Sequence, residues 1–199
     1  MRVLVACEFS GIVREAFRAR GHDAWSCDIL PAEDNSRHHY QLDALAMVKA
    51  GGPDGDWDLL IAHPPCTYLC NSGVRWIYNA DGSPNYERKV AFRDAAHFFV
   101  QLKHSPIARI AIENPIPHKY AKEWIGKYDQ IIQPWMFGHG EIKATCLWLK
   151  NLPFLQPTNV VSGRQPRAHH ASPGPDRWKE RSRTLKGIAD AMADQWGSL

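Results

Sequence analysis

The stretch DLLIAHPPCTYLC, residues 58–70, begins with an apolar run and continues into two prolines and two cysteines. A short run of this kind is typical of a strand that is buried on both faces of a parallel sheet. Pro64 and Pro65 restrict φ and remove two backbone donors, so the chain should leave the sheet in one extended direction. Cys66 is therefore expected at the rim of the sheet, just beyond the carboxyl end of the strand.

Apolar strands alternate with amphipathic helices along most of the chain. An apolar run at residues 3–6 is followed by Ser10 and Gly11, and then by apolar residues at helical spacing up to Gly21. This alternation indicates an α/β fold with a mostly parallel sheet and helices on both faces. Further strands are predicted at residues 23–27, 40–42, 58–62, 107–112, 128–132 and 145–149, and further helices at 44–50, 91–102 and 188–196.

The length and the cysteine content limit the class of protein. The 199 residues fit a single domain, 1–199, and no apolar run approaches the roughly 20 residues that cross a bilayer. Glu8 interrupts the apolar start, which favours a strand over a signal peptide. Five cysteines, an odd number without a secretory signal, favour free thiols. We therefore expect a cytoplasmic protein that does not contact a membrane.

Positive charge is concentrated in one segment. The net charge of the chain is +3, whereas residues 150–186 contain eight lysines and arginines and two acidic residues. Residues 151–183 also contain five prolines and two glycines, which predicts a loop-rich insert. A local basic segment favours contact with a polyanion; a basic loop that touches nothing is the alternative.

Ligands of open α/β sheets bind outside the carboxyl ends of the strands. The loop at residues 8–11 has small residues that would let a ligand approach the next helix, but it lacks a GxGxxG pattern, and Glu8 would repel a pyrophosphate. A cationic or nucleoside-like cofactor fits this loop better. Asp28 could bind a ribose or be an ordinary surface residue. Asp43 could contact an adenine amino group or cap the following helix.

Two reactive groups follow neighbouring predicted strands. Cys66 is a candidate nucleophile, which acts as the thiolate. A buried structural cysteine, or a zinc site formed by His63, Cys66 and Cys70, are the alternatives. Glu113 ends a very apolar strand, and a partly desolvated carboxyl group there should have a raised pKa and hold or donate a proton. Because both strands end at the same edge, we expect Cys66 and Glu113 to lie close together.

In chain order, these stretches resemble the cytosine-C5 DNA methyltransferases, which have a class I, Rossmann-like methyltransferase fold and use S-adenosylmethionine. CEFSG at residues 7–11 is similar to the cofactor loop of that family. PPC at 64–66 is its nucleophile motif, and ENP at 113–115 is similar to its Glu-Asn-Val motif. The resemblance extends over most of the chain before the basic insert.

The resemblance implies a role for individual residues. Cys66 would be the attacking thiolate, and Glu113 would hold the base at its ring nitrogen. Lys143 would place a cation near the base and the thiolate. The implied cofactor-binding residues are Glu8, Phe9, Ser10, Gly11, Asp28, Asp43 and Pro64, with Phe9 at the adenine and Asp28 at the ribose. The implied substrate-binding residues are Pro65, Asn114, Thr145, Arg75, Arg164 and Arg167, and no metal is implied.

The chain departs from the family pattern in two places. In FGHGEIKAT, Glu141, Lys143 and Thr145 stand where the family has Gln and two Arg, and Thr145 cannot form a guanidinium fork to the pyrimidine. The insert at 151–183 takes the place of a longer target-recognition region. We therefore expect a short target or a partner protein that supplies specificity. Such economy would suit a phage-encoded enzyme.

The implied function is transfer of a methyl group to carbon 5 of a cytosine flipped out of double-stranded DNA, through a covalent Cys66 adduct. Residues 67–88 would form a lid over the site. One alternative is an amino methyltransferase, but that class needs a polar residue before its prolines and an aromatic after them, where this chain has His63 and Cys66. The others are C5 modification of a free pyrimidine nucleotide and a catalytically silent binder of cofactor or DNA.

Overall fold

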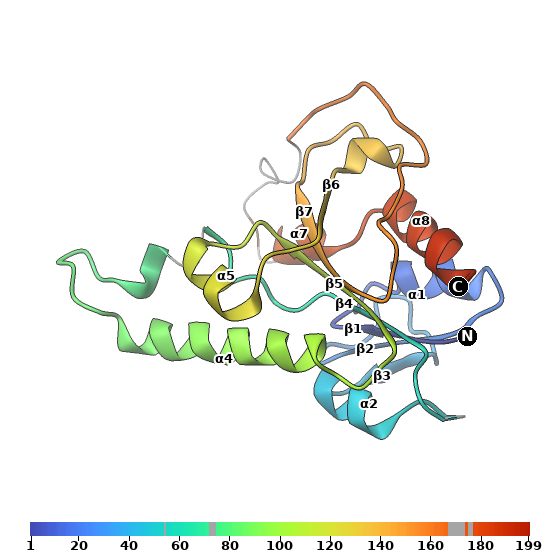
Figure 1. The fold of residues 1–199 in the computed structure, drawn as a ribbon, viewed down its shortest axis with the longest axis horizontal. Helices are drawn as coiled ribbons and strands as arrows, with labels where there is room; N and C mark the ends of the chain where they lie inside the picture. Colours follow the sequence, from blue (N-terminus) through green and yellow to red (C-terminus); the bar gives the residue numbers. More distant parts are fainter. Residues whose placement is uncertain (54, 72–74, 167–173, 175–176) are drawn as a thin grey trace.

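The computed structural model describes residues 1–53, 55–71, 75–166, 174 and 177–199 (Figure 1). Within these residues, seven strands form one sheet in the order β3-β2-β1-β4-β5-β7-β6. The strands are β1 (Arg2–Ala6), β2 (Asp23–Asp28), β3 (His39–Gln41), β4 (Leu59–Ala62), β5 (Arg109–Pro115), β6 (Gln130–Ile132) and β7 (Thr145–Lys150).

The strand directions place one edge of the sheet where ligands bind in α/β proteins. The pairs β3/β2, β2/β1, β1/β4 and β4/β5 are parallel, whereas β7 is antiparallel to both β5 and β6. The chain moves outward from β1 to β3 and then returns to the other side of β1 as β4. Ala6 pairs with Ala62 at this reversal, so the loops after β1 and β4 start side by side. Such a reversal is the usual position of a ligand crevice.

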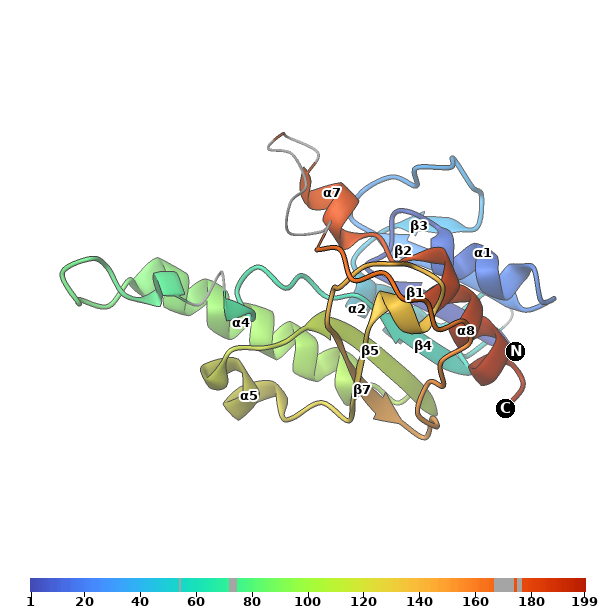
Figure 2. The same cartoon turned by 90° about the horizontal axis from the view of Figure 1, so that it is seen from above.

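Helices cover both faces of the sheet (Figures 1 and 2). α1 and α8 lie together on one face, and α2, α4 and α5 cover the other. Side chains alternate along β1, so that Leu4 and Ala6 join one apolar cluster while Val3 and Val5 join the other. The helices are α1 (Ile12–Arg18), α2 (Ala44–Ala50), α4 (Tyr86–Lys103), α5 (Lys119–Ile125), α7 (Arg177–Ser182) and α8 (Lys186–Gly197), with short 3-10 turns η1 (Arg75–Ile77) and η2 (Pro134–Met136).

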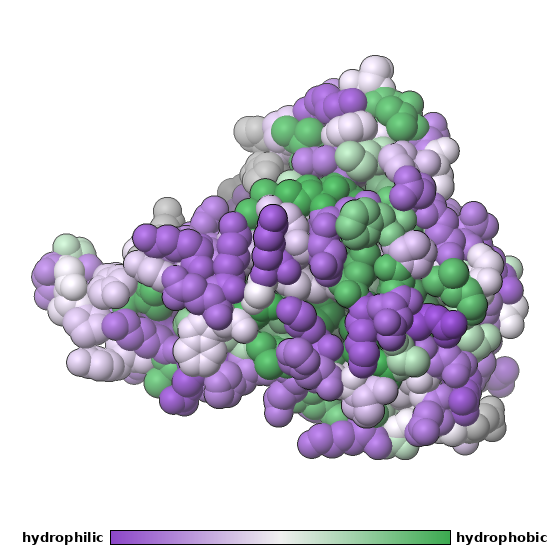
Figure 3. Space-filling model, viewed as in Figure 1, coloured by the Kyte–Doolittle hydropathy of each residue, from purple (hydrophilic) through white to green (hydrophobic). Residues whose placement is uncertain are grey.

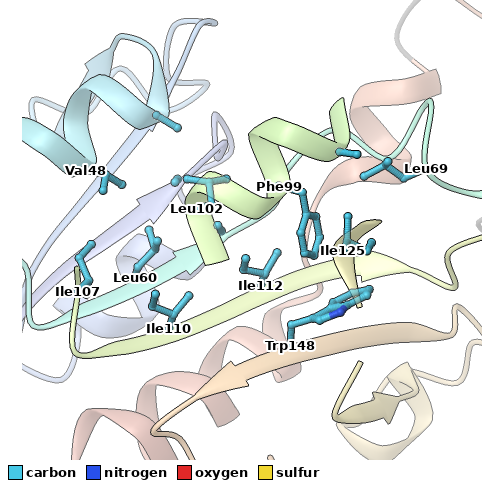
Figure 4. Packing of buried hydrophobic residues seen from close by; sticks show 14 of the residues in the cluster. Val48, Leu60, Leu69, Phe99, Leu102, Ile107, Ile110, Ile112, Ile125 and Trp148 are labelled. Atoms are coloured by element: carbon cyan, nitrogen blue, oxygen red, sulfur yellow. The ribbon is translucent and has the colours of Figure 1, made fainter. Parts of the chain in front are cut away.

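Large side chains fill the space between the sheet and α4 (Figure 4). Leu60 on β4 and Ile112 on β5 pack under Phe99 of α4, and all three are fully buried. The rings of Phe99 and Trp148 meet edge to face, with centroids 4.9 Å apart. This packing fixes β4 and β5, the two strands whose carboxyl ends carry Cys66 and Glu113.

The last helix docks as predicted. Ile188, Met192 and Trp196 of α8 are buried against the sheet and α1. The indole Nε1 of Trp196 donates a hydrogen bond to the carbonyl oxygen of Pro153 at 3.0 Å, which also fixes the start of the basic insert.

Several element boundaries differ from the prediction. β5 extends to Pro115 because β7 pairs with it along its whole length, so Glu113 and Asn114 lie within the strand instead of after it. α4 begins at Tyr86, after Asn85 caps it, and its polar first turns project from the body (Figure 1). β3 is shifted one residue toward the N-terminus. The helices α5 and α7 were not predicted, because each is short and only α5 buries apolar residues.

The surface is mostly polar. Hydrophilic residues cover much of the face shown in Figure 3, including the projecting start of α4. Hydrophobic residues appear on this face as separate patches. Among the described residues, none of the helices combines the length and the apolar character needed to cross a membrane.

Replacing Trp196 with alanine should lower the free energy of unfolding by about 3–5 kcal/mol, because it leaves a large cavity between α8 and the sheet. Urea denaturation followed by circular dichroism measures this change. Trp124→Ala is the matched control: Trp124 is 46% exposed, and its loss should cost about 1 kcal/mol. Equal effects of the two substitutions would contradict the docking of α8.

Candidate functional site

The loop after β1 turns sharply at the reversal point of the sheet. Cys7 and Gly11 have φ values of 59° and 73°, and Glu8 between them is buried. The Glu8 carboxylate accepts hydrogen bonds from the backbone N–H groups of Val13 (2.7 Å) and Arg14 (3.2 Å). Burial raises the pKa of Glu8, against the opposing effect of His63 and these N–H groups. The amides at the start of α1, which we expected a ligand to approach, are therefore bound by Glu8 itself.

Gly11 and Phe9 shape this loop in different ways. A side chain at Gly11 would collide with the guanidinium group of Arg14, which is fully buried and pairs with Asp34. Phe9 is 7% exposed, and its ring lies 5.9 Å from the ring of Trp178 on α7. Ser10 Oγ lies 3.5 Å from the N–H of Ile12, at the outer limit of a hydrogen bond. An aromatic pair thus lines the loop where the cofactor's adenine was expected.

The two aspartates after β2 and β3 make local hydrogen bonds. Asp28 accepts one from the N–H of Leu30 at 2.9 Å, and burial raises the pKa of its carboxyl group. Asp43 accepts one from the N–H of Ala46 at 3.0 Å and caps α2. The capping alternative for Asp43 is confirmed. Contacts of either residue to a cofactor stay predictions.

The double proline is held to the neighbouring strand. Asn114 of β5 is buried, and its side-chain Nδ2 donates a hydrogen bond to the carbonyl oxygen of Pro64 at 2.7 Å. The N–H of His63 bonds to the carbonyl oxygen of Ala6 at 2.9 Å, which continues the pairing of β4 with β1. Pro64 is buried and Pro65 exposed. The backbone that leads to Cys66 is therefore fixed from both sides.

Cys66 is half-buried, and its thiol is hydrogen-bonded to the thiol of Cys70. This bond, followed by burial, raises the pKa of Cys66, whereas the positive charge of Arg181 acts in the opposite direction. The resting group is therefore a thiol, and not the thiolate that a nucleophilic cysteine uses.

His63 and Glu113 form a buried pair. His63 Nδ1 lies 3.0 Å from Glu113 Oε2, and each side chain is 12% exposed. The hydroxyl of Thr184 donates to the same oxygen at 3.3 Å. The pair connects the segment after β4 with the end of β5, next to the bond from Asn114 to Pro64.

The expectation of a raised pKa at Glu113 is wrong for the resting protein. Burial by itself would raise the pKa of Glu113, but the hydrogen bond and charge of His63, together with Lys143, outweigh it and lower the pKa. Burial would lower the pKa of His63, but Glu113 and Glu8 outweigh it and raise the pKa. Glu113 is therefore an anion at neutral pH, and its charge favours the protonated form of His63.

Lys143 precedes β7, and Thr145 is its first residue. The charge of Lys143 lowers the pKa of Glu113, and its Nζ donates to the carbonyl oxygen of Arg183 at 3.4 Å. Its predicted place near the base and the thiolate stays a prediction. Thr145 is buried, and its hydroxyl donates to the carbonyl oxygen of Lys143 at 3.1 Å. The Thr145 hydroxyl is thus used by its own backbone.

Of the three arginines predicted to bind the substrate, only Arg164 has a described side chain. The guanidinium of Arg164 lies 3.9 Å from the ring centre of Trp135 and donates to the carbonyl oxygens of Val161 and Gly163, so it holds its own loop. Arg75 begins η1, and its side chain is outside the described part of the structure. Arg167 is also outside it.

The end of the basic insert folds back over the site. Trp178 lies against Phe9, and Thr184 bonds to Glu113. In addition, Arg183 forms two hydrogen bonds, at 3.0 and 2.6 Å, with Glu33 in the loop after β2. Residues 177–184 therefore form a wall of the site. Neither this wall nor the pairing of His63 with Glu113 was predicted from the sequence. Only His63 had a signal, its position directly before the double proline.

The zinc alternative is not supported by the geometry. Over the ranges that the structure describes, which include His63, Cys66 and Cys70, the His, Cys, Asp and Glu side chains form no group of three or more that could hold a metal ion.

The strand order, the single antiparallel strand and the helices on both faces give the predicted Rossmann-like α/β fold. Comparison with known protein families gave no match for this chain, and neither did comparison with curated proteins.

Two similar solved structures are methyltransferases by name. One is described as a DNA modification methyltransferase encoded within a prophage (E. coli); it is 16% identical, with 87% of this chain and 55% of that chain covered and a TM-score of 0.48. The other is a variant of DNMT2 from Spodoptera frugiperda, 12% identical, with 83% of this chain and 54% of that chain covered and a TM-score of 0.41. This chain thus spans about half the length of either protein.

Cys70→Ala should lower the pKa of Cys66, because it removes the hydrogen bond that raises that pKa. At a pH below both values, alkylation of Cys66 by iodoacetamide should become about tenfold faster for each unit by which the pKa falls. Mass spectrometry of the Cys66 peptide measures the rate. Cys70→Ser keeps a hydrogen-bonding group and should have a smaller effect; an unchanged rate in Cys70→Ala would contradict the thiol pair.

The pair of His63 and Glu113 should make stability depend on pH in a defined window. The lowered pKa of Glu113 adds stability above its ordinary value of 4.5, which is lost as the pH falls through the folded value. The raised pKa of His63 adds stability below its ordinary value of 6.5, which is lost as the pH rises through the folded value. The full contribution is therefore expected between these two values.

Glu113→Gln should lower the free energy of unfolding by about 3 kcal/mol near pH 5.5 and by less near pH 9. Urea denaturation at both pH values measures the difference. Glu87→Gln, at an exposed position on α4, is the control and should change little at either pH. A cost that does not vary with pH would argue against a charged pair.

Proposed function

We propose that this chain is an S-adenosylmethionine-dependent DNA methyltransferase that acts on carbon 5 of cytosine, with Cys66 as the nucleophile. The observation that carries the proposal is that two contacts join the segment leading to Cys66 with the strand that contains Glu113. Asn114 bonds to Pro64 at 2.7 Å, and His63 pairs with Glu113 at 3.0 Å. The similar structures are too distant to add to this argument.

The reaction calls for one soft nucleophile and one acid. Carbon 5 of cytosine reacts poorly with an electrophile until a thiolate adds to carbon 6. In the proposed step, Cys66 gives up its S–H proton to water as its sulfur bonds to carbon 6, and the displaced π electrons make carbon 5 nucleophilic enough to accept the methyl group. Glu113 donates a proton to the ring nitrogen and so offsets the charge that builds up in the ring. Loss of the carbon-5 proton and departure of the thiol then restore the aromatic ring.

The residues at the reversal point fit the cofactor that the proposal requires. Two buried polar atoms there, His63 Nε2 and Asn114 Oδ1, have no hydrogen-bond partner within the described structure, which suits a site that a ligand completes. Glu8 and Asp28 place acidic groups at this edge, which favours a cation over a phosphate. S-adenosylmethionine, when bound, supplies the methyl group from a sulfonium cation. Phe9 would flank its adenine and Asp28 would hold its ribose.

Double-stranded DNA is the proposed substrate, with the target cytosine flipped into the site. Residues 150–186 carry a net charge of +6, which suits phosphate contacts that do not depend on sequence. The first turns of α4 add two cations that lie over aromatic rings. Arg88 lies over Tyr68 at 4.6 Å, and Lys89 lies over Tyr78 at 4.8 Å. A short insert provides few base contacts, so the proposal includes a short target or a partner protein for specificity.

A catalytically silent binder of cofactor and DNA is the second candidate. The raised pKa of Cys66 favours it, because a neutral thiol does not add to a pyrimidine. The inward hydroxyl of Thr145 also favours it, since this position then offers no cation to the base.

Incubation with a 5-fluorocytosine duplex and S-adenosylmethionine should trap a covalent complex, because fluorine at carbon 5 cannot leave as a proton. Denaturing gel electrophoresis and mass spectrometry should place the adduct on Cys66. Cys66→Ser should form none, whereas Cys70→Ser should still form it. Base-resolution mapping of methylated mixed-sequence DNA would then identify the target.

If no adduct forms across many duplex sequences while calorimetry shows that cofactor binding is intact, the silent binder is the better assignment. If free dCMP is modified and duplex DNA is not, the substrate is the free nucleotide.

A further inference from the structure

His63 is a buried titratable residue for which the proposed chemistry has no role. It directly precedes the double proline, and its Nδ1 lies 3.0 Å from Glu113 Oε2. Its other ring nitrogen, Nε2, is buried and has no hydrogen-bond partner among the described residues. A purely structural histidine in such a position usually has both nitrogens satisfied. This arrangement fits a histidine that gives up and takes back a proton during a reaction.

The charged groups around His63 come from four parts of the chain. Glu8 from the loop after β1, Asp28 from the end of β2 and Glu113 from β5 are acidic. Lys143, just before β7, is the cation among the groups that act on it. With Glu113 in direct contact, the acidic groups favour the charged imidazolium, and Glu113 is left without a proton of its own. The acid role proposed for Glu113 therefore needs a proton source.

We infer that His63 is a positioning residue that stores the proton which Glu113 delivers to the pyrimidine ring. The inference rests on the proposed function and extends it. The hydrogen bond from Nδ1 to Oε2 at 3.0 Å is the direct route for this proton.

The protons balance over one cycle. As Cys66 adds to carbon 6, its S–H bond breaks and that proton passes to water, while the Nδ1–H bond of His63 breaks and an O–H bond forms on Glu113, which leaves a neutral imidazole. The carboxylic acid then donates its proton to the ring nitrogen and returns to the carboxylate. When the carbon-5 proton is lost to water, the S–C6 bond breaks, the departing sulfur takes up a proton from water, the ring nitrogen gives its proton back to Glu113, and His63 takes it up again. No oxidant or further reactant is required.

The stored proton can be observed without any activity. Nitrogen-15 NMR of the histidine rings distinguishes an imidazolium from a neutral imidazole, and His63→Asn identifies the signal of His63. At pH 7 in the protein without ligands, the His63 ring should carry two protons. In Glu113→Gln it should carry one, because the main cause of its charge has been removed. A singly protonated His63 ring at pH 7 in the unsubstituted protein would overturn the inference.

The delivery of the proton is tested by the rate of adduct formation with the 5-fluorocytosine duplex as a function of pH. His63→Asn should lower the rate at pH 7.5 by about 100-fold. It should also shift the break in the profile, the pH above which the rate falls, to a lower value. The reason is that Glu113 alone loses its proton to solvent more easily than the pair does. A structural defect would lower the whole profile without moving this break. His104→Asn, on the exposed end of α4, is the control and should change neither.

An unmoved break in His63→Asn overturns the inference even if the rate falls. If the unsubstituted protein forms no adduct, the proposed function and the delivery step fail together. The NMR measurement then still reports whether the pair holds a proton, so the two failures are distinguishable.

Discussion

The hydrogen bond from Asn114 to the carbonyl oxygen of Pro64 is the contact on which the site depends. Prolines restrict the direction of the backbone but donate no hydrogen bonds, so the segment after β4 cannot pair with β5 through its own amides. The Asn114 amide supplies the missing link at 2.7 Å, within a core that packs β4 and β5 under the same helix. It ties the segment that leads to Cys66 to the strand that contains Glu113.

Burial and pairing set the charges of this site in ways that single residues do not reveal. Glu113 on its own would be a desolvated acid with a raised pKa, and beside His63 it becomes an anion. Cys66 on its own would be an ordinary thiol, and beside Cys70 it resists ionisation. Both groups are thus held in the form opposite to the one in which the proposed reaction uses them.

The sheet could be predicted from the sequence because its strands are apolar runs bounded by glycine, proline and polar residues. The parallel pairing of β4 and β5, the strands next to Cys66 and Glu113, could likewise be predicted from their apolar residues. The pairing of Glu113 with His63 could not be predicted, since it depends on side-chain direction after two prolines. The wall at residues 177–184 was missed because it is short and polar, and long-range contacts to Phe9 and Glu33 position it. The antiparallel partner that lengthens β5 left no local pattern either.

The return of residues 177–196 to the start of the chain has a consequence for biosynthesis. α8 covers the same face as α1, and Thr184 reaches Glu113 on the central sheet. The strands and helices that precede this segment leave the ribosome first, with their apolar face for α8 still uncovered. Glu113 therefore acquires its final surroundings only after residues 177–184 have been synthesised, long after its own strand has emerged.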